Sequence, residues 1–340
     1  MRRLLLLKGR NMTHTVIIDC DPGIDDSLAL MLALKSPELE VMGITITCGN
    51  APVDMGGANA LKILEHMDRL DVGVYKGAEQ PLEIAFTNAL DTHGADGLGE
   101  SFLPEVRGAA VQEESALDFM KRALMEEGCM VIALGPMTNL ARLAQEAPEA
   151  FGRITRLVSM GGNHRSHGNC SPVAEYNYWC DPHAAAIVFD AMAERGKKVE
   201  MIGLDVTRKI VLTPSLLSYI ERIERLRPEE GAFIRAITKF YFDFHWRYEH
   251  LIGCVINDPL AVAYAVNSSL CQGFEAYTQI ATEGIARGQS IADEMHFYQK
   301  PANARILTQV DAKAFFRHFL SRILDTEEAD LDLVDVLVGE

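Results

Sequence analysis

Short runs of apolar and β-branched residues alternate along the chain with longer segments of helical periodicity. The short runs predict buried strands at residues 16–18, 41–47, 72–75, 129–133, 154–160 and 199–204. The helical patterns fall at residues 27–34, 55–67, 115–125, 139–147, 182–193 and 214–226. Strands that alternate with helices are typical of a parallel or mixed sheet covered by helices. The sequence therefore predicts an α/β fold with an open, mostly parallel, Rossmann-like central sheet.

The pattern is continuous, because no repeat, low-complexity tract or linker rich in proline and glycine divides it. We expect residues 15–340 to form a single domain, although 340 residues would also allow two. Residues 1–14 are expected to be an N-terminal extension, with Met12 as an alternative start. The apolar run in this extension is too short for a signal peptide, and no stretch is long enough to cross a membrane.

The composition indicates which kinds of binding partner and which cellular compartment to expect. The formal net charge is -16, and such an acidic surface repels phosphate backbones, so we expect no nucleic-acid partner. A small neutral substrate is not disfavoured. The seven cysteines are scattered and contain no CxxC pair, which gives no zinc or redox signature. Their odd number favours a reducing compartment, and we expect a cytoplasmic protein.

Polar stretches follow four of the predicted strands at the points where the strands end. In open α/β sheets, ligands bind at the carboxyl ends of the strands. Aspartate, asparagine, threonine and glycine dominate these stretches, which makes them the expected site. The stretches are residues 19–26, 49–50, 135–139 and 161–163.

The first of these stretches contains four carboxylates within eight residues: Asp19, Asp21, Asp25 and Asp26. Carboxylates this close repel one another unless a cation neutralises them. The nearby donors are oxygens, which favours Ca²⁺ or Mg²⁺ over zinc or copper. A proline–glycine turn between them would let Asp21 and Asp26 converge. The alternative is that Asp25 and Asp26 cap the following helix, which would explain two of the four carboxylates.

Two later segments carry further candidate groups. Asp258 is followed by a proline and an apolar helix, so it is either a ligand or a plain helix N-cap. Residues 169–177 combine amides, a carboxylate and aromatic side chains in one expected loop before a helix. These groups suit the hydroxyls of a sugar, and the alternative is a polar surface loop.

Six segments together resemble the inosine–uridine-preferring nucleoside hydrolases, in the order and at the spacing of that family, over roughly residues 15–325. The resemblance implies hydrolysis of the N-glycosidic bond of ribonucleosides, with purine or pyrimidine bases, to free base and ribose. It also implies a homodimer or homotetramer. The matching segments are residues 19–26, 48–50, 135–139, 160–162, 174–177 and 257–259.

The resemblance further implies one Ca²⁺ per subunit, held by Asp21, Asp26, Asp258 and the backbone carbonyl of Thr138. Asp21 would also be the general base that takes a proton from the attacking water. Asp19, at the end of a strand, would support these ligands. For the substrate site, Asp25 would bind the ribose hydroxyls. The full set implied by the resemblance is Asp25, Asn50, Met160, Asn169, Glu175, Tyr176, Asn177, Asn257 and Asp258.

The group that assists departure of the base is less clearly marked. Asn257 stands where non-specific members of the family carry histidine and purine-specific relatives carry tryptophan, and an amide cannot act as a general acid near neutral pH. His93 and His245 are the candidates. The alternative for His93 is a solvated loop residue. Tyr241, His245 and Glu249 share one helix face, and the alternative is that this face is simply core.

Two other classes remain consistent with parts of the pattern. A strand followed by Asp-x-Asp also opens phosphatases of the haloacid-dehalogenase type, and Asp19 and Asp21 fit that opening. The segment that follows them does not fit it. A calcium- or nucleoside-binding protein without hydrolase activity would be consistent with Asn257, which cannot protonate a leaving base.

Overall fold

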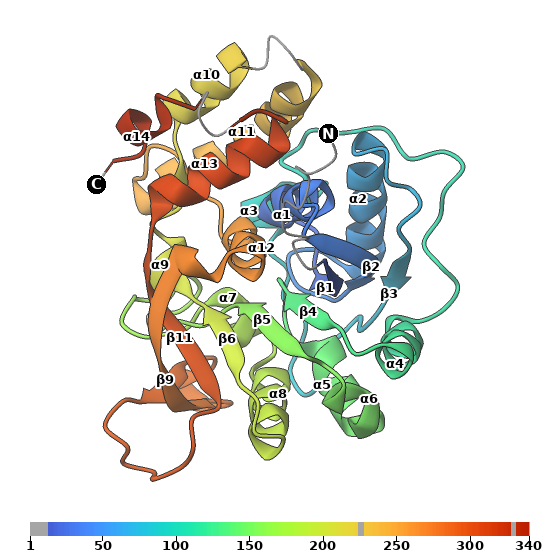
Figure 1. Ribbon diagram of the computed structural model, residues 1–340, viewed down its shortest axis with the longest axis vertical. Helices are drawn as coiled ribbons and strands as arrows, with labels where there is room; N and C mark the ends of the chain where they lie inside the picture. Colours follow the sequence, from blue (N-terminus) through green and yellow to red (C-terminus); the bar gives the residue numbers. More distant parts are fainter. Residues whose placement is uncertain (1–12, 224–227, 328–330, 340) are drawn as a thin grey trace, which may run out of the picture.

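The computed structural model describes residues 13–223, 228–327 and 331–339, and its centre is one large sheet (Figure 1). The strands of this sheet run in the order β10-β9-β11-β6-β5-β4-β1-β2-β3. All neighbours from β11 to β3 are parallel, whereas β9 and β10 are added antiparallel. The strands are β1 His14–Cys20, β2 Leu39–Ile46, β3 Val74–Lys76, β4 Met130–Ala133, β5 Arg156–Met160, β6 Val199–Ile202, β9 Cys271–Ile280, β10 Ser290–Asp293 and β11 Ala304–Val310.

The predicted α/β fold with a mostly parallel sheet is confirmed, and all six predicted strands are present in it. Their ends differ from the expected ones by a few residues. The strands β9, β10 and β11 were not predicted. Exposed positions interrupt the buried ones irregularly in β9, so this strand shows neither a continuous apolar run nor a regular alternation. A further pair, β7 (Val211–Leu212) and β8 (Cys254–Val255), forms a separate two-stranded ribbon.

Helices cover both faces of the sheet (Figure 1). On one face lie α1 (Ile24–Lys35), α2 (Val53–His66), α10 (Pro214–Ile223), α11 (Pro228–Glu249), α12 (Asp258–Val266) and α13 (Ala312–Ile323). On the other lie α4 (Ala116–Glu126), α5 (Thr138–Glu146), α6 (Pro148–Gly152) and α8 (Pro182–Glu194). The predicted helix 214–226 corresponds to α10, and its last residues, 224–226, lie outside the described part. So do residues 1–12 of the expected extension. No helix within the described residues has the length and apolar character to span a membrane.

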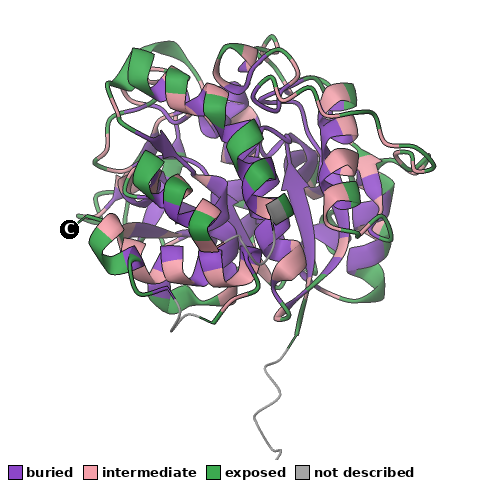
Figure 2. Cartoon of the chain, turned by 90° about the horizontal axis from the view of Figure 1, so that it is seen from above, coloured by how far each residue is buried: buried purple, intermediate pink, exposed green. Residues whose placement is uncertain are grey.

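The core has two halves because the central strands are buried on both faces. Val16 and Ile18 of β1 belong to the cluster under α1 and α12, and Ile17 belongs to the cluster under α5 and α8. This period of two explains why β1 appears in the sequence as an unbroken apolar run. Figure 2 shows this buried interior and the exposed outer faces of the helices around it.

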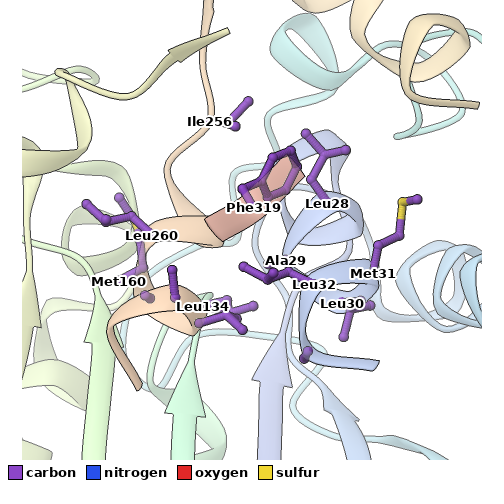
Figure 3. Packing of buried hydrophobic residues seen from close by; sticks show 14 of the residues in the cluster. Leu28, Ala29, Leu30, Met31, Leu32, Leu134, Met160, Ile256, Leu260 and Phe319 are labelled. Atoms are coloured by element: carbon purple, nitrogen blue, oxygen red, sulfur yellow. The ribbon is translucent and has the colours of Figure 1, made fainter. Parts of the chain in front are cut away.

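The helix α1 is unusual because it is buried on all sides from Ile24 to Ala33. It packs against the sheet and also against α12 and α13. Leu28 of α1, Leu260 of α12 and Phe319 of α13 belong to the same apolar cluster (Figure 3). A helix enclosed in this way is apolar all round rather than on one stripe. As a result, its acidic first turn is fixed deep inside the molecule.

The strand register brings the polar ends of the strands together. Asp19 of β1 is paired with Thr45 of β2 on one side and with Ala133 of β4 on the other. Since these strands are parallel, the segments that follow them leave the sheet at the same edge. The polar stretches expected from the sequence therefore meet there.

We expect replacement of Leu260 by alanine to lower the free energy of unfolding by about 2–5 kcal/mol, because a completely buried side chain would leave a cavity. Denaturant unfolding followed by circular dichroism measures the change. Leu70→Ala is the matched control, since Leu70 is exposed and should change stability little. An equal effect of the two substitutions would contradict the packing of α12.

Candidate active site

A cavity of about 580 Å³ lies at the carboxyl edge of the parallel strands. Leu134, directly after β4, and Met160, the last residue of β5, form part of its wall. Among the residues expected from the sequence, Asp21, Asp26 and Thr138 do not line this cavity. Those that do are Asp25, Asn50, His93, Met160, Asn169, Glu175, Tyr176, Asn177, His245, Asn257 and Asp258.

Asp25, Asp26 and Asp258 form a buried cluster, in which one carboxylate oxygen of each residue lies within 4.8 Å of the others. Asp25 and Asp26 lie in the first turn of α1. Asp258 is the first residue of α12, and α12 packs against α1. Burial raises the pKa of Asp26 to about 6 and raises the pKa of Asp258, and the charge of Asp25 adds to both shifts. Three ionised carboxylates this close and this buried require a positive charge between them.

Helix capping accounts for only a small part of this arrangement. Asp26 Oδ2 accepts a hydrogen bond from the backbone amide of Gly23 at 3.0 Å, at the start of α1. Asp258 is not the N-cap of α12, because Asn257 occupies that position. Asp25 and Asp258 lie in the first turns of their helices, where the helix dipole favours a carboxylate, but neither caps its helix with its side chain.

Asp21 lies beside the cluster rather than inside it. Its Oδ2 accepts a hydrogen bond from the backbone amide of Asn50 at 2.6 Å, and its own amide donates to Asp26 Oδ1 at 3.3 Å. Its Oδ1 is buried and has no hydrogen-bond partner among the described residues. Burial, together with the charge of Asp26, raises the pKa of Asp21. This open oxygen is available to a cation or to a proton.

Two glycines provide the space in which Asp21 sits. A Cβ atom at Gly49 would overlap Asp21 Oδ2, and a Cβ atom at Gly135 would overlap Oδ1. These glycines lie in the segments after β2 and β4, the two neighbours of β1. Each of these two polar strand-end segments therefore contains a glycine, and the lack of a side chain there leaves room for Asp21.

Asp19 does not line the cavity, and its side chain links neighbouring elements of the sheet. Its Oδ1 accepts hydrogen bonds from Thr45 Oγ1 at 2.6 Å and from Asn139 Nδ2 at 2.8 Å. Burial raises the pKa of Asp19 to about 7. Asn139 also donates to the carbonyl of Ile46, so this carboxyl links β1 to β2 and to α5. The expected supporting role agrees with this placement.

In the segment after β4, Leu134 lines the cavity, whereas Thr138 does not. Thr138 is the first residue of α5, and its hydroxyl donates to Asp181 Oδ2 at 2.8 Å. Leu134 lines the cavity, and its carbonyl accepts a hydrogen bond from Asn177 Nδ2 at 2.6 Å.

Glu175 is the N-cap of a short helix, α7 (Tyr176–Cys180). Its Oε1 accepts from the amide of Asn177 at 2.7 Å, and its Oε2 accepts from the amides of Gly162 at 2.8 Å and Tyr178 at 3.2 Å. Burial raises its pKa to about 7, against the effect of these three donors. The carboxyl group is thus held in one orientation. Asn169, in contrast, is exposed at the rim of the cavity.

The two residues after Glu175 are also held by main-chain groups. Asn177 Nδ2 donates to the carbonyl of Met160 at 3.2 Å as well as to that of Leu134. The hydroxyl of Tyr176 lies within hydrogen-bond distance of the carbonyls of Gly49, at 3.1 Å, and Thr87, at 3.0 Å. Tyr176 therefore ties the loop after β2 to a second loop, and its hydroxyl is already engaged.

His93 is the last residue of α3 (Leu90–His93), and it is buried in the cavity wall. Its Nδ1 accepts a hydrogen bond from the backbone amide of Ile24 at 3.1 Å, so the neutral ring carries its proton on Nε2. Burial lowers the pKa of His93. Protonation of Nδ1 would break the bond to Ile24. The ring is therefore suited to donating a hydrogen bond from Nε2, not to storing a second proton.

His245 of α11 is held differently. Its Nδ1 lies 2.9 Å from the carbonyl oxygen of Tyr241, and its Nε2 lies 3.4 Å from the amide nitrogen of Val255. A neutral ring with its proton on Nδ1 satisfies both contacts. Burial lowers the pKa of His245. Both of its nitrogens are therefore engaged by the backbone, which distinguishes it from His93.

Aromatic side chains form the part of the cavity next to these histidines. The predicted face of α11, with Tyr241, His245 and Glu249, does line the cavity, and Phe244 and Tyr248 extend it. The ring of Tyr241 lies 4.4 Å from that of His245, in an edge-to-face arrangement. Such a surface suits the flat, apolar faces of a heterocycle.

Trp179 and Arg208 are among the cavity residues that the sequence did not predict. Trp179 lies on α7, and the guanidinium carbon of Arg287 is 3.8 Å from the centre of its ring. The aromatic run around Asn177 is a signal that could have identified Trp179. Arg208 lines the cavity and donates to the carbonyl of Gly168 at 3.1 Å, but no motif surrounds it in the sequence.

The donors on the carboxylate side fit a hard divalent cation. They are the clustered oxygens of Asp25, Asp26 and Asp258 and the unpartnered oxygen of Asp21. Oxygen sets of this kind suit Ca²⁺ or Mg²⁺ rather than softer metals. Carboxylates and amides around the same space can also stabilise positive charge that develops on a bound ligand.

Comparison with known proteins agrees with this site. Residues 16–317 match the family model described as inosine-uridine preferring nucleoside hydrolase. The pyrimidine-specific ribonucleoside hydrolase RihA of Klebsiella pneumoniae (strain 342) is 34% identical over 311 residues, which cover 89% of this chain and 96% of that protein. The structure of a purine-preferring ribonucleoside hydrolase from Gardnerella vaginalis aligns with a TM-score of 0.84 at 34% identity, covering 92% of this chain and 98% of that one.

A plant nucleoside hydrolase, PpNRh1, gives a TM-score of 0.82 at 28% identity and covers 92% of this chain and 99% of its own. These matches extend over nearly the whole sheet and its helices. They decide against the phosphatase alternative, which rested on Asp19 and Asp21 alone. The chain belongs to the inosine-uridine preferring nucleoside hydrolase family and is a ribonucleoside hydrolase of that family.

Proposed function

We propose that this enzyme hydrolyses the N-glycosidic bond of ribonucleosides to free base and ribose with one Ca²⁺ per subunit. The observation that carries the proposal is the buried cluster of Asp25, Asp26 and Asp258 beside a cavity with an aromatic wall. The carboxylate side matches the hydroxyls of a sugar and a cation. The aromatic side matches a base.

For the cation we assign the carboxylates of Asp21, Asp26 and Asp258. The close approach of Asp26 to Asp258 and the open Oδ1 of Asp21 support this set. Asp25 belongs to the same cluster, and its Oδ2 accepts hydrogen bonds from Asn257. Since Asp25 also lines the cavity, it is assigned to the ribose hydroxyls.

For the main-chain ligand we assign the carbonyl of Leu134 in place of that of Thr138. Leu134 lines the cavity, and Thr138 does not. A bound calcium ion would supply positive charge that orients the ribose hydroxyls and a water molecule and lowers the pKa of that water. The remaining chemistry falls to the side chains.

Asp21 acts as the general base in this proposal. Its Oδ2 is fixed by the amide of Asn50, and the carboxylate so oriented takes the proton as water attacks C1′ of the ribose. Cleavage at C1′ develops positive charge on the sugar ring. The ionised carboxylate of Asp25 and the amide oxygens near it stabilise that charge electrostatically.

Departure of the base is assisted by a hydrogen bond from His93 Nε2. This assignment is supported by the acceptor role of His93 Nδ1, which fixes the tautomer. His245 has no nitrogen left for the substrate, so we assign it to the wall of the base subsite. Asn257 cannot donate a proton at neutral pH and is not assigned to this step.

We propose nucleosides of either base class as substrates. The two relatives at 34% identity are named pyrimidine-specific and purine-preferring, so overall similarity does not select a base. We further propose a homodimer or homotetramer, which rests on the family resemblance. A cytoplasmic location is supported by the seven cysteines, all of which are free.

The protein supplied with Ca²⁺ should release ribose from uridine or inosine, and Asp21→Asn should lower kcat by about 10²–10⁴-fold because the general base is lost. A reducing-sugar assay on a panel of nucleosides measures both. Circular dichroism should show that the fold of the variant is intact.

Asp54→Asn is the matched control, because it makes the same chemical change at an exposed carboxylate. An active Asp21→Asn variant would refute the assignment of the base. Tight nucleoside binding without ribose release by the unmodified protein would instead favour the binding-protein alternative.

Calcium should stabilise the protein more as pH rises. Burial raises the pKa of Asp26 to about 6 and also raises those of Asp21 and Asp258, so the metal-free fold favours their neutral forms. The free energy of unfolding of the metal-free protein should therefore fall as pH rises from about 4 to above 6. Calcium binds the ionised forms and should reverse this loss.

Thermal unfolding in EDTA and in CaCl₂, at about pH 5 and about pH 7.5, measures the effect. The increase in Tm with calcium should be larger at the higher pH. An equal increase at both pH values would contradict the assignment of buried carboxylates to the cation.

His93→Ala should reduce kcat for inosine or uridine about tenfold or more, because a hydrogen bond to the leaving base is lost. Turnover of p-nitrophenyl riboside, whose leaving group needs no such help, should change much less. His245→Ala should affect both kinds of substrate alike. An equal loss on both substrates for His93→Ala would exclude its role in base departure.

A further inference from the structure

Asn257 occupies the N-cap of α12 without capping the helix. Asparagine is among the best N-cap residues, because its side-chain oxygen can accept a hydrogen bond from an amide of the first turn. Here the side chain makes no such bond. Its Oδ1 is buried and has no hydrogen-bond partner among the described residues. The side chain is therefore held in place by something other than its own helix.

The group that holds it is Asp25 of α1. Asp25 Oδ2 accepts from Asn257 Nδ2 at 3.1 Å and from the backbone amide of Asn257 at 3.3 Å. The hydroxyl of Tyr241, on α11, lies 3.5 Å from the same oxygen. Three donors from two other helices thus converge on one carboxylate oxygen. The orientation of the amide follows from this contact, because Oδ1 turned toward Asp25 would meet another acceptor.

The same contacts leave the other oxygen of Asp25 free. Its Oδ1 makes no hydrogen bond to any residue in the described part of the chain. The residue lines the cavity beside Asp258. A carboxylate fixed through one oxygen presents the other at a defined position, so little rotational freedom is lost when a ligand binds.

We propose that Asn257 is a positioning residue for the sugar: it fixes Asp25 so that Oδ1 meets the 2′-hydroxyl of the ribose, and it thereby strengthens discrimination against 2′-deoxyribose. This inference rests on the proposed hydrolase function and on the assignment of Asp25 to ribose. Asn257 then acts on the sugar side of the cavity, as a hydrogen-bond donor to Asp25. It does not act as a general acid, because an amide cannot donate a proton near neutral pH.

The test compares Asn257→Leu with the unmodified protein on uridine and on 2′-deoxyuridine. Loss of the side-chain donor to a charged acceptor should lower kcat/KM for uridine about tenfold. The loss for 2′-deoxyuridine should be small, because that substrate does not use the contact. The ratio of kcat/KM for uridine to kcat/KM for 2′-deoxyuridine should therefore fall clearly. Asn257→His, which keeps an N–H donor, should recover part of the ratio.

Asn267→Leu is the matched control, since Asn267 lies exposed at the opposite end of the same helix and bonds Ser269. It should leave the ratio unchanged even if it lowers stability. An Asn257→Leu variant with an unchanged ratio would overturn the proposal, whatever its total activity.

Calorimetric binding of the two nucleosides separates this proposal from the proposed function. If the unmodified protein binds uridine without cleaving it, the hydrolase function fails, and the ratio of the two affinities replaces the kinetic ratio. Asn257→Leu should then lower the affinity for uridine more than that for 2′-deoxyuridine. Equal losses would overturn the role of Asn257.

Discussion

The repulsion among buried carboxylates is the constraint on which the rest of this structure depends. Asp21, Asp25, Asp26 and Asp258 lie where water cannot screen them, and each additional negative charge makes the others harder to keep ionised. Helix capping and backbone donors compensate only part of this cost. The arrangement becomes reasonable when a cation and a polyhydroxylated substrate share the space.

The fold makes this concentration of charge attainable by enclosing α1 on all sides. Its apolar body packs against the sheet, α12 and α13, so the position of its acidic first turn is fixed by the core. The segments that follow β2 and β4, the parallel neighbours of β1, place Gly49 and Gly135 next to Asp21. The residues that stabilise the fold and those that form the site are therefore separate. The buried leucines of α1 fix the helix in the core, and its first turn carries the carboxylates of the site.

The sequence allowed the acidic segment and Asn50 to be found, because strand ends in a parallel sheet meet at one edge, whereas the ligand role of Asp258 came from the family resemblance. It could not show that Leu134 lines the cavity and Thr138 does not, since that depends on the backbone path of one turn. It also could not distinguish His93 from His245. Their difference lies in backbone partners distant in the sequence, Ile24 and Val255. The edge strand β9 escaped detection because its burial is irregular.

The carboxylates that meet in the cluster come from opposite ends of the chain, since Asp26 belongs to the first helix and Asp258 to one of the last. A cation bound between them would act as a cross-link that closes a very long loop. The enzyme could then open only after the ion had left or its ligands had separated. Its half-life against unfolding and proteolysis would accordingly follow the concentration of free calcium around it.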